Sequence, residues 1–353
     1  MLIGLEHYKG KKILVIGHTG FKGAWLSRVL VLSGARVFGL ALPPEPGTLK
    51  SKIENLGIEK EIFLDINSRL DIENFFTENS FEGVFHFAAQ SLVIKSYDLP
   101  VETFMTNVIG TANVLDSILN HKAANWVIVA TTDKVYKNVE QSKGYKENDS
   151  LGGKDPYSAS KAGTEMVVMA WQNLSNVSNL GVKIISVRAG NVIGGGDISE
   201  NRLLPDLIKS FRLNINGKIR NPNSIRPWQH VLDPLNGYLK LGIGLILKKD
   251  LSNSYNFGPG KSSKLTVKQI AEYAVRYWGD KANVVIDSGK KFPPESKLLW
   301  LNSKLAKRDL GWSNFLEAKE AVRWVIEWEK LSISQSHIQA LDNQIFEFFG
   351  SKQ

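Results

Sequence analysis

Short β-branched runs alternate with longer helical patterns through the first half of this 353-residue chain. The runs are apolar on both faces, and this pattern indicates parallel strands that helices cover on both sides. The sequence therefore predicts an α/β fold with a doubly wound parallel sheet of the Rossmann type. The expected strands are residues 13–16, 36–40, 61–64, 84–87, 126–130 and 184–187.

After Val187 the pattern loosens into turn-rich sequence, a short helix candidate at 202–211 and a polar stretch at 217–227. Amphipathic helices are then expected at 267–278 and 315–331. We therefore expect a second, smaller mixed α/β domain beside the sheet, which would hold the substrate. The expected division gives residues 1–187 and 229–257 to the Rossmann domain, and 188–228 and 258–353 to the second domain.

Composition narrows the functional classes. The chain has no cysteine, which excludes disulfides, a thiolate nucleophile and a zinc-thiolate site. Its six histidines show no metal-ligand spacing, so no metal is expected. The N-terminus lacks a leader pattern, and no charge-free apolar stretch approaches the length of a membrane span. We expect a cytoplasmic protein with no membrane partner.

The net charge of +9 is unevenly distributed. Residues 201–300 hold 17 basic and 7 acidic side chains, so this region accounts for the whole excess. Such a surplus admits a nucleic-acid partner. However, the basic residues are not interleaved with aromatic residues on which bases stack, so no nucleic acid is expected. A small acidic substrate explains part of the surplus and leaves most of it unassigned.

A glycine-rich motif, GHTGFKG at 17–23, follows the first expected strand and opens an amphipathic helix. Dinucleotide binding needs a tight turn, a close approach of backbone to pyrophosphate and a helix N-terminus with free N–H groups. The motif provides all three in the right context. Its candidate cofactor-binding residues are Gly17, Thr19, Gly20, Phe21 and Gly23.

The second strand, however, lacks the acidic residue that usually binds the adenosine ribose, since residues 37–44 read VFGLALPP. NAD and NADP therefore both stay open, although the absence of an arginine there favours NAD. After the third strand, Asp65 and Ile66 are candidates to contact the adenine. An ordinary strand-end aspartate is an equally good interpretation of Asp65.

A tyrosine followed four residues later by a lysine places both on one helix face, where the ammonium can lower the phenol's pKa. The chain has this spacing at Tyr8, Tyr157 and Tyr277. Only Tyr157 opens a helix after the fifth expected strand. Ligands of doubly wound sheets bind at the carboxyl ends of the strands, so Tyr157 and Lys161 are the catalytic candidates.

With these motifs in place, the chain resembles the extended short-chain dehydrogenases/reductases that act on nucleotide sugars. The similarity covers nearly the whole length, and the dehydratases specific for CDP-glucose are the most similar branch. Other dehydratases of the family have Asp-Glu where this chain has Asp133-Lys134. The motifs that carry the resemblance are GHTGFKG, HFAAQ at 86–90, TNVIGT at 106–111, TTDKVY at 131–136, GYKENDSLGGKDPYSASK at 144–161, RAGNVIGGGD at 188–197 and RPWQHVLDPL at 226–235.

The resemblance implies a 4,6-dehydratase that converts CDP-glucose to CDP-4-dehydro-6-deoxyglucose. Tyr157, assisted by Lys161 and Thr132, would take the proton of the 4-hydroxyl while hydride passes to NAD. Lys134 would then remove the carbon 5 proton, and Asp133 would protonate the departing 6-hydroxyl. For these roles Asp133 must keep a proton near neutral pH and Lys134 must be able to lose one. A simple ion pair at a strand end is the alternative interpretation.

The resemblance also implies a tightly bound NAD that is recycled in each turnover, and a homodimer formed by four helices. The helices would be 101–119 and 157–171, whose apolar residues extend beyond one face. Further cofactor contacts would come from Phe87, Ala88, Ala89 and Asn107. Substrate contacts would come from Asn191, Arg202 and Arg226, because guanidinium groups suit a pyrophosphate.

Three alternatives stay open. A nucleotide-sugar 4-epimerase needs Tyr157, Lys161 and NAD but no pair for elimination, so Asp133 and Lys134 argue against it. A dehydratase for another nucleotide hexose is the second. The third is a catalytically silent scaffold that binds nucleic acid through its basic region, against which the complete set of catalytic residues argues.

Overall fold

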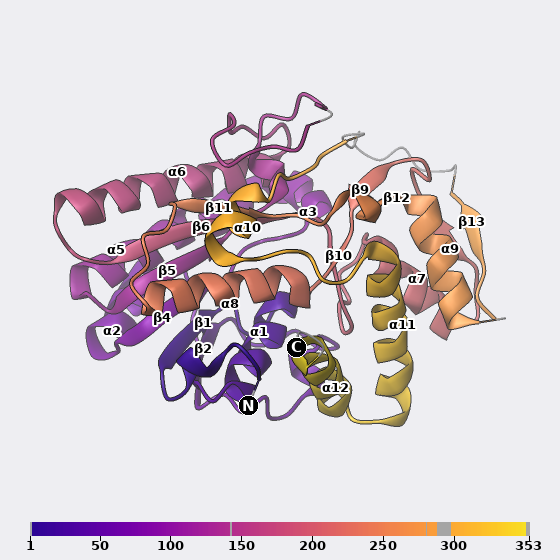
Figure 1. Ribbon diagram of the computed structural model, residues 1–353, viewed down its shortest axis with the longest axis horizontal. Helices are drawn as coiled ribbons and strands as arrows, with labels where there is room; N and C mark the ends of the chain where they lie inside the picture. The colour runs from indigo at the N-terminus through magenta and orange to yellow at the C-terminus, as the bar shows by residue number, and fades with distance from the viewer. Residues whose placement is uncertain (1, 142, 280, 288–297, 351–353) are drawn as a thin grey trace.

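The computed structural model describes residues 2–141, 143–279, 281–287 and 298–350. Its centre is a seven-stranded parallel sheet in the order β11-β6-β5-β4-β1-β2-β3 (Figure 1). This arrangement confirms the predicted doubly wound sheet. The strands are β1 (Lys12–Ile16), β2 (Arg36–Ala41), β3 (Lys60–Phe63), β4 (Phe81–His86), β5 (Ala124–Ala130), β6 (Lys183–Ala189) and β11 (Ser254–Phe257).

All six expected strands are present, and their ends differ from the predicted ones by up to three residues. The pattern did not predict β11 as a strand, because its sequence, Ser-Tyr-Asn-Phe, is short and half polar. The polar asparagine of this strand forms its hydrogen bonds inside the protein. Asn256 is fully buried and donates to the Tyr145 backbone oxygen at 2.9 Å.

Helices cover both faces of the sheet and divide its core in two. On one face Phe76, Val114 and Val168 pack with the apolar side chains of the strands. They come from α2 (Arg69–Glu78), α5 (Thr111–His121) and α6 (Pro156–Val177). The other face is covered by α1 (Phe21–Leu32) and α8 (Leu232–Ile246), whose Trp25 and Leu235 join the larger core.

Helix α1 follows directly from its sequence. Trp25, Leu26, Val29 and Leu30 recur at helical spacing and are all fully buried. Gly34 lies just beyond the helix with a φ of +84°, a backbone conformation that favours glycine. The amphipathic helix predicted after the glycine-rich motif is therefore confirmed, and it ends before Gly34.

Between β4 and β5 the chain forms a nearly continuous helical segment. Its parts are α3 (Val93–Asp98), α4 (Pro100–Phe104), the π-helical turn η3 (Met105–Gly110) and α5. Wider helical turns of this kind are often found at functional sites. Here the turn contains Asn107, which is fully buried.

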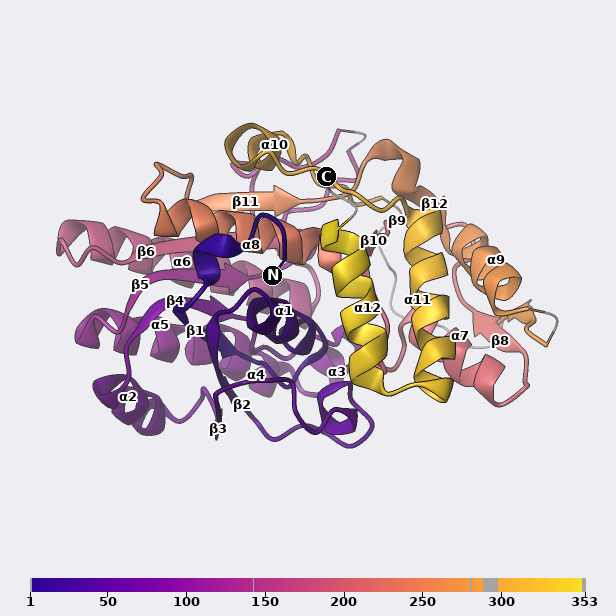
Figure 2. The ribbon, with the colours of Figure 1, turned by 60° about the horizontal axis from the view of Figure 1, so that its bottom comes forward.

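A smaller lobe lies beyond the carboxyl ends of the sheet strands (Figures 1 and 2). Among the described residues, three two-stranded sheets are present in and beside this lobe, together with helices, as a mixed α/β region requires. They pair β7 (Val192–Ile193) with β10 (Gln229–His230), β12 (Lys264–Thr266) with β9 (Ile225–Pro227), and β13 (Val284–Ile286) with β8 (Gly217–Ile219). The helices of this region are α7 (Leu203–Arg212), α9 (Val267–Trp278) and α11 (Ala318–Ser334).

Helix α9 has the predicted ends, α7 is displaced by one residue, and α11 by three. The lobe is joined to the sheet by one continuous core that includes Val187, Trp228 and Trp324. The exact division of the chain into two domains stays a prediction.

The C-terminal helix α12 (His337–Gly350) returns to pack beside α1 (Figure 2). Arg28 of α1 binds Asp342 of α12 through two hydrogen bonds, at 2.7 and 2.6 Å. The short helix α10 (Lys304–Leu310) lies near α8 and β11. Among the described residues, no helix is long and apolar enough to cross a membrane.

Candidate active site

The glycine-rich loop between β1 and α1 is shaped by close backbone contacts. Gly17 has a φ of +91°, and a Cβ there would lie 2.6 Å from the backbone nitrogen of Ala88. At Gly23 a Cβ would lie 2.0 Å from the Gly17 carbonyl oxygen. Only glycine fits either position, so the first and third glycines of the motif set the path of the loop.

The second glycine, Gly20, leaves open the space between the glycine-rich loop and the start of α1, which we call the cradle. Gly20 is the N-cap of α1, and no side chain caps that helix end. The first N–H groups of α1 are therefore directed toward the space above the loop, where a phosphate would accept their hydrogen bonds. Thr19 closes one side by donating to the Leu42 carbonyl oxygen at 3.1 Å.

The segment after β4 forms the next wall of this cradle. The backbone nitrogens of Phe87 and Ala88 donate to the Ile16 oxygen at 2.7 and 3.0 Å, which keeps this segment against the glycine loop. Asn107 accepts from the Gln90 nitrogen at 2.8 Å and donates to Ser160 at 2.8 Å. Its amide therefore ties residues 87–90 to α6 and acts as a scaffold for the cradle.

After β3, only one of the two residues expected to contact the adenine is accessible. Asp65 is exposed, but one of its oxygens accepts from the Asn67 nitrogen at 2.9 Å. Ile66 is only 4% exposed and packs in the core near Gly110, so it offers little surface to a base. Asp65 therefore has the better access to a cofactor of the two.

Sequence reasoning missed an acidic group at this end of the sheet. Glu61 of β3 lies 3.2 Å from the imidazole of His18 and 3.1 Å from the ammonium of Lys50. Burial lowers the pKa of His18, although Glu61 acts in the opposite direction. The alternation of polar residues in β3 could have suggested Glu61, but its partner His18 is a spacer residue of the glycine motif.

Two of the predicted catalytic residues, Asp133 and Lys134, lie in the 3-10 turn η4 (Asp133–Val135), which follows shortly after β5, and a third, Thr132, is the N-cap of this turn. Thr132 caps this turn: its hydroxyl accepts from the Lys134 nitrogen at 3.4 Å and donates to Asp133 at 3.1 Å. Asp133 is 3% exposed, whereas Lys134 is partly exposed. Thr132 also lies close enough to Tyr157 to lower the pKa of its phenol, so the structure brings these groups together.

Tyr157 and Lys161 lie in the first turns of α6, which begins after the N-cap Asp155. Burial raises the pKa of Tyr157 to about 12, while Thr132 and Arg202 act in the opposite direction. Burial lowers the pKa of Lys161 to about 8, and its ammonium donates to the Ala130 oxygen at 3.3 Å. The rival spacings at Tyr8 and Tyr277 lie in other parts of the fold.

The environment of Asp133 agrees with the prediction that its carboxyl keeps a proton near neutral pH. Burial raises its pKa, and the nearby Lys134, Thr132, Arg226 and Lys22 oppose this effect only in part. Gly190 adds to the enclosure, because a Cβ there would lie 2.9 Å from Asp133 Oδ2. Gly190 was not predicted as a site residue, since an apolar Gly-rich turn gave no chemical signal.

Lys22 is a second residue that sequence reasoning missed. Burial lowers its pKa to about 8, and the charge of Arg202 lowers it further, whereas Asp133 acts in the opposite direction. The charge of Lys22 also lowers the pKa of Lys161, after the larger effect of burial. In the glycine motif, position 22 is a spacer between glycines. It lies in the first turn of α1, which faces the predicted catalytic residues, and this placement could have identified Lys22 from the sequence.

Four arginines of the basic region 201–300 lie in different surroundings. Arg202 donates to Asp197 at 3.1 Å and interacts electrostatically with Tyr157. Arg226 interacts with Asp133. In contrast, Arg212 binds Glu329 at 2.6 Å, and Arg220 donates to the Asn201 backbone oxygen at 3.1 Å. The two arginines near the catalytic residues are those that the sequence analysis selected.

Asn191 lies just before the short strand β7, between Gly190 and the β7–β10 pair. Its backbone oxygen accepts from the Gln229 nitrogen at 3.1 Å. This bond holds the start of β10 against β7. The side chain of Asn191 is partly exposed at the carboxyl end of β6, as a substrate contact requires.

Beneath these residues lies a buried ion pair between Glu165 of α6 and Arg188 of β6. Two hydrogen bonds of 2.8 Å join them, and the side chains are 1% and 3% exposed. Thr131 and Ser186 also donate to Glu165, at 2.5 and 2.8 Å. Burial alone would raise the pKa of Glu165, but these donors hold it below its usual value.

Arg188 extends the network to the segment after η4. It donates to the Tyr136 hydroxyl at 2.6 Å and to the Glu147 backbone oxygen at 2.9 Å. The ion pair therefore connects α6, β5, β6 and the loop that follows the catalytic turn. It contacts none of the predicted catalytic side chains directly, but it holds the elements that carry them.

Comparisons with known proteins match nearly the whole chain to one family and to one relative. The family model described as GDP-mannose 4,6 dehydratase matches residues 14–325. The chain is 41% identical over 336 residues to the CDP-glucose 4,6-dehydratase of Salmonella typhimurium, and the match covers 93% of each chain.

Solved structures share the fold. A UDP-glucose 4-epimerase from Thermotoga maritima superposes with a TM-score of 0.79 at 22% identity, covering 91% of this chain and 99% of that one. A dTDP-glucose 4,6-dehydratase from Streptomyces venezuelae, solved with NAD bound, gives a TM-score of 0.76 at 20% identity, with 92% and 98% covered.

The buried ion pair leads to a stability prediction. Arg188→Met leaves Glu165 buried without its cation and should lower the free energy of unfolding by about 3–5 kcal/mol. Urea denaturation, followed by circular dichroism, measures this loss. Replacing both residues, in Arg188→Met/Glu165→Met, should recover a large part of it because no lone charge is then buried.

Arg36→Met is the matched control, since Arg36 makes an equally short bidentate pair with Glu59 on the exposed surface. Its loss should be below about 1 kcal/mol. Equal losses in the Arg188 and Arg36 variants would contradict the importance assigned to the buried pair.

Proposed function

The chain belongs to the GDP-mannose 4,6-dehydratase family, and on this premise we propose that it is an NAD-dependent dehydratase acting on CDP-glucose. The product is CDP-4-dehydro-6-deoxyglucose, and one water molecule is released. The observation that carries this proposal is the pair Asp133-Lys134 at the end of β5, beside Tyr157 and Lys161. The 41% identical relative from Salmonella typhimurium, which bears this activity in its name, supports the choice of substrate.

The residues of the cradle suit a dinucleotide. The open end of α1 at Gly20 would take the pyrophosphate, and the segment 87–90 would line the path toward the nicotinamide. Lys161 would bind the nicotinamide ribose. When bound, NAD supplies the oxidant for carbon 4 and later the hydride for carbon 6.

Tyr157 is placed to act on the 4-hydroxyl of the sugar. Burial raises the pKa of Tyr157 to about 12, so a nearby positive charge is needed to favour the phenolate, the form that accepts the substrate proton. Lys161, one helical turn away, provides such a charge when protonated. Thr132, which lies beside the phenol, would help to orient it.

The elimination requires an acid and a base on the two neighbouring carbons. Once carbon 4 is a ketone, the proton on carbon 5 is acidic, and Lys134 removes it. Asp133 donates its proton to the 6-hydroxyl, which leaves as water. The raised pKa of Asp133 keeps this proton available at neutral pH, as general acid catalysis requires.

The acid and base pair also separates the two candidate reactions on this fold. A 4-epimerase returns the hydride to carbon 4 and has no bond to break between carbon 6 and its oxygen. It therefore gains nothing from a protonated carboxyl beside a lysine. Arg202 and Arg226 suit the substrate's pyrophosphate in both cases, so they do not discriminate between the reactions.

The test is incubation of the purified protein, without added NAD, with CDP-glucose, dTDP-glucose, UDP-glucose or GDP-mannose. CDP-glucose should give the 4-keto-6-deoxy product, detected by its absorbance in alkali. Asp133→Asn and Lys134→Met should bind cofactor and substrate normally but slow product formation by about 10²- to 10⁴-fold, the usual contribution of a general acid or base.

Lys137→Met serves as the control, since Lys137 is an exposed lysine three residues from Lys134. It should keep the full rate. Conversion of CDP-glucose to CDP-galactose without a keto sugar would establish the epimerase instead. Undiminished rates in both the Asp133 and Lys134 variants would remove the roles assigned to these residues.

We also propose a homodimer formed through α4, η3 and α6. Val101 and Val177 are 69% and 77% exposed, and Met105 and Met169 on the same helices are about half exposed. An apolar hollow of about 310 Å³ lies along this surface, lined by Pro100, Val101, Phe104, Met105, Val108 and Ile109. An exposed apolar surface of this kind is typical of a protein interface.

Introducing charge into this surface should separate the subunits, because each buried carboxylate would lose its hydration. Met105→Glu/Met169→Glu should elute as a monomer in size-exclusion chromatography with light scattering, whereas the wild type elutes as a dimer. Leu213→Glu is the control, since Leu213 is also an exposed apolar residue, 62% exposed, but lies at the end of α7. A dimer that persists in the double variant would exclude this interface.

A further inference from the structure

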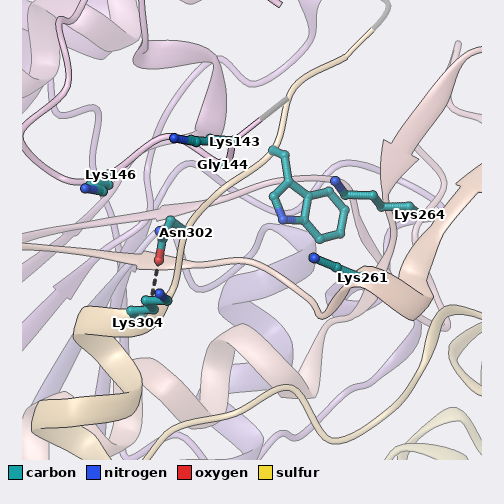
Figure 3. A pocket seen from close by; sticks show the side chains of 8 residues that line it. Lys143, Gly144, Lys146, Lys261, Lys264, Asn302 and Lys304 are labelled. Atoms are coloured by element: carbon teal, nitrogen blue, oxygen red, sulfur yellow. Dashed lines mark hydrogen bonds between the residues drawn. The ribbon is translucent and has the colours of Figure 1, made fainter. Parts of the chain in front are cut away.

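A second cavity, of about 430 Å³, lies outside the set of residues assigned to the reaction. Three segments meet around it: the loop 143–146, residues 261–264 at the start of β12, and residues 300–304 at the start of α10 (Figure 3). The lining residues are Lys143, Gly144, Lys146, Lys261, Lys264, Trp300, Asn302 and Lys304.

The backbone holds this cavity in shape. The Tyr145 nitrogen donates to the Trp300 oxygen at 2.7 Å, and the Asn302 nitrogen donates to the Tyr145 oxygen at 2.8 Å. Gly144 permits this contact, because a Cβ there would lie 2.8 Å from the carbonyl carbon of Leu301. Two of the three segments are thus fixed against each other without any contribution from the lysines.

Five of the described lining residues are lysines, and none of the described ones is a carboxylate. The acidic residues of the adjoining loop are used elsewhere: Glu147 accepts from the Asn256 nitrogen at 2.9 Å, and Asp149 from the Lys146 backbone nitrogen at 2.8 Å. Within the described residues, no ion pair joins any of the five ammonium groups to an acid. Lys264 lies instead over the ring of Trp300, 4.4 Å from its centre.

Like charges gathered around one cavity repel one another, and an anion placed among them removes this repulsion. Lysine binds phosphate as a compact point charge, and several lysines suit a ligand with several phosphate charges. The volume lies in the range of small-molecule sites. Because Lys264 occupies one face of Trp300, the cavity does not depend on stacking a base.

We propose that this cavity is a binding site for an oligophosphate, a chain of two or three phosphates, either free or as the tail of a nucleotide. The site is distinct from the proposed substrate residues but close to them. Lys264 on β12 is paired with Pro227 on β9, and the next pair joins Leu265 to Arg226. Lys261 and Lys264 also belong to the basic region 201–300, so the site accounts for a further part of its charge surplus.

Isothermal titration with inorganic tripolyphosphate tests the proposal on the full-length protein. Lys261→Gln/Lys264→Gln and, from the other two segments, Lys146→Gln/Lys304→Gln should each weaken binding by about tenfold or more, since each removes two charge-assisted contacts. Lys249→Gln/Lys268→Gln removes the same charge from exposed lysines outside the cavity and should bind as the wild type does.

Arg226→Gln separates this site from the substrate site without assuming any reaction. It should leave tripolyphosphate binding within about twofold of the wild type. A loss in Arg226→Gln with none in the two cavity variants would place the anion at the substrate site and overturn the proposal. Absence of binding by the wild type would overturn it as well.

A parallel titration with CTP distinguishes the two sources of the phosphate chain. Equal affinity for CTP and tripolyphosphate indicates that the cavity recognises the phosphates alone. Tighter binding of CTP, lost in both cavity variants, identifies a nucleotide as the ligand. CTP affinity that is unchanged in the cavity variants would count against the nucleotide form of the proposal.

Discussion

The buried pair of Glu165 and Arg188 is the interaction on which the proposed catalytic arrangement depends. Glu165 lies on α6 one helical turn after Lys161, and Thr131, shortly before the turn η4, donates to it. Arg188 lies on β6 and reaches Tyr136, directly after that turn. One ion pair thus connects the helix of Tyr157 with both ends of the segment that holds Thr132, Asp133 and Lys134. An exposed pair would be weakened by water, whereas this one is nearly inaccessible to it.

The same burial shifts the pKa values of the groups proposed to react. It raises the pKa values of Asp133 and Tyr157 and lowers those of Lys161 and Lys22. A carboxyl that keeps its proton near neutral pH is what the proposed general acid Asp133 requires, whereas the raised pKa of Tyr157 has to be offset by a positive charge beside it. Gly190, packed against Asp133, contributes by keeping the carboxyl enclosed. The chemistry therefore depends on the close packing at the end of β5 as much as on the identity of the residues.

The sequence predicted what local patterns encode and missed what arises from contacts between distant segments. Apolar runs gave six strands, and the glycine spacing gave the loop before α1. Strand β11 was missed because Asn256 becomes a good strand residue only when Tyr145, far along the chain, accepts its amide. Lys22 and Gly190 were missed because their proximity to Asp133 depends on how α1 and β6 meet β5. The lysine-lined cavity, built from three separate segments, has no local pattern at all.

The central claim is that oxidation, elimination and reduction occur at one site with one cofactor that never leaves it. The most direct measurement uses CDP-glucose with deuterium on carbon 4, incubated with the enzyme without added cofactor, and locates the label in the product by NMR. The account predicts that deuterium is found on carbon 6 of the 4-keto-6-deoxy sugar. A keto product without deuterium at carbon 6, or an epimer that keeps it on carbon 4, would contradict the account.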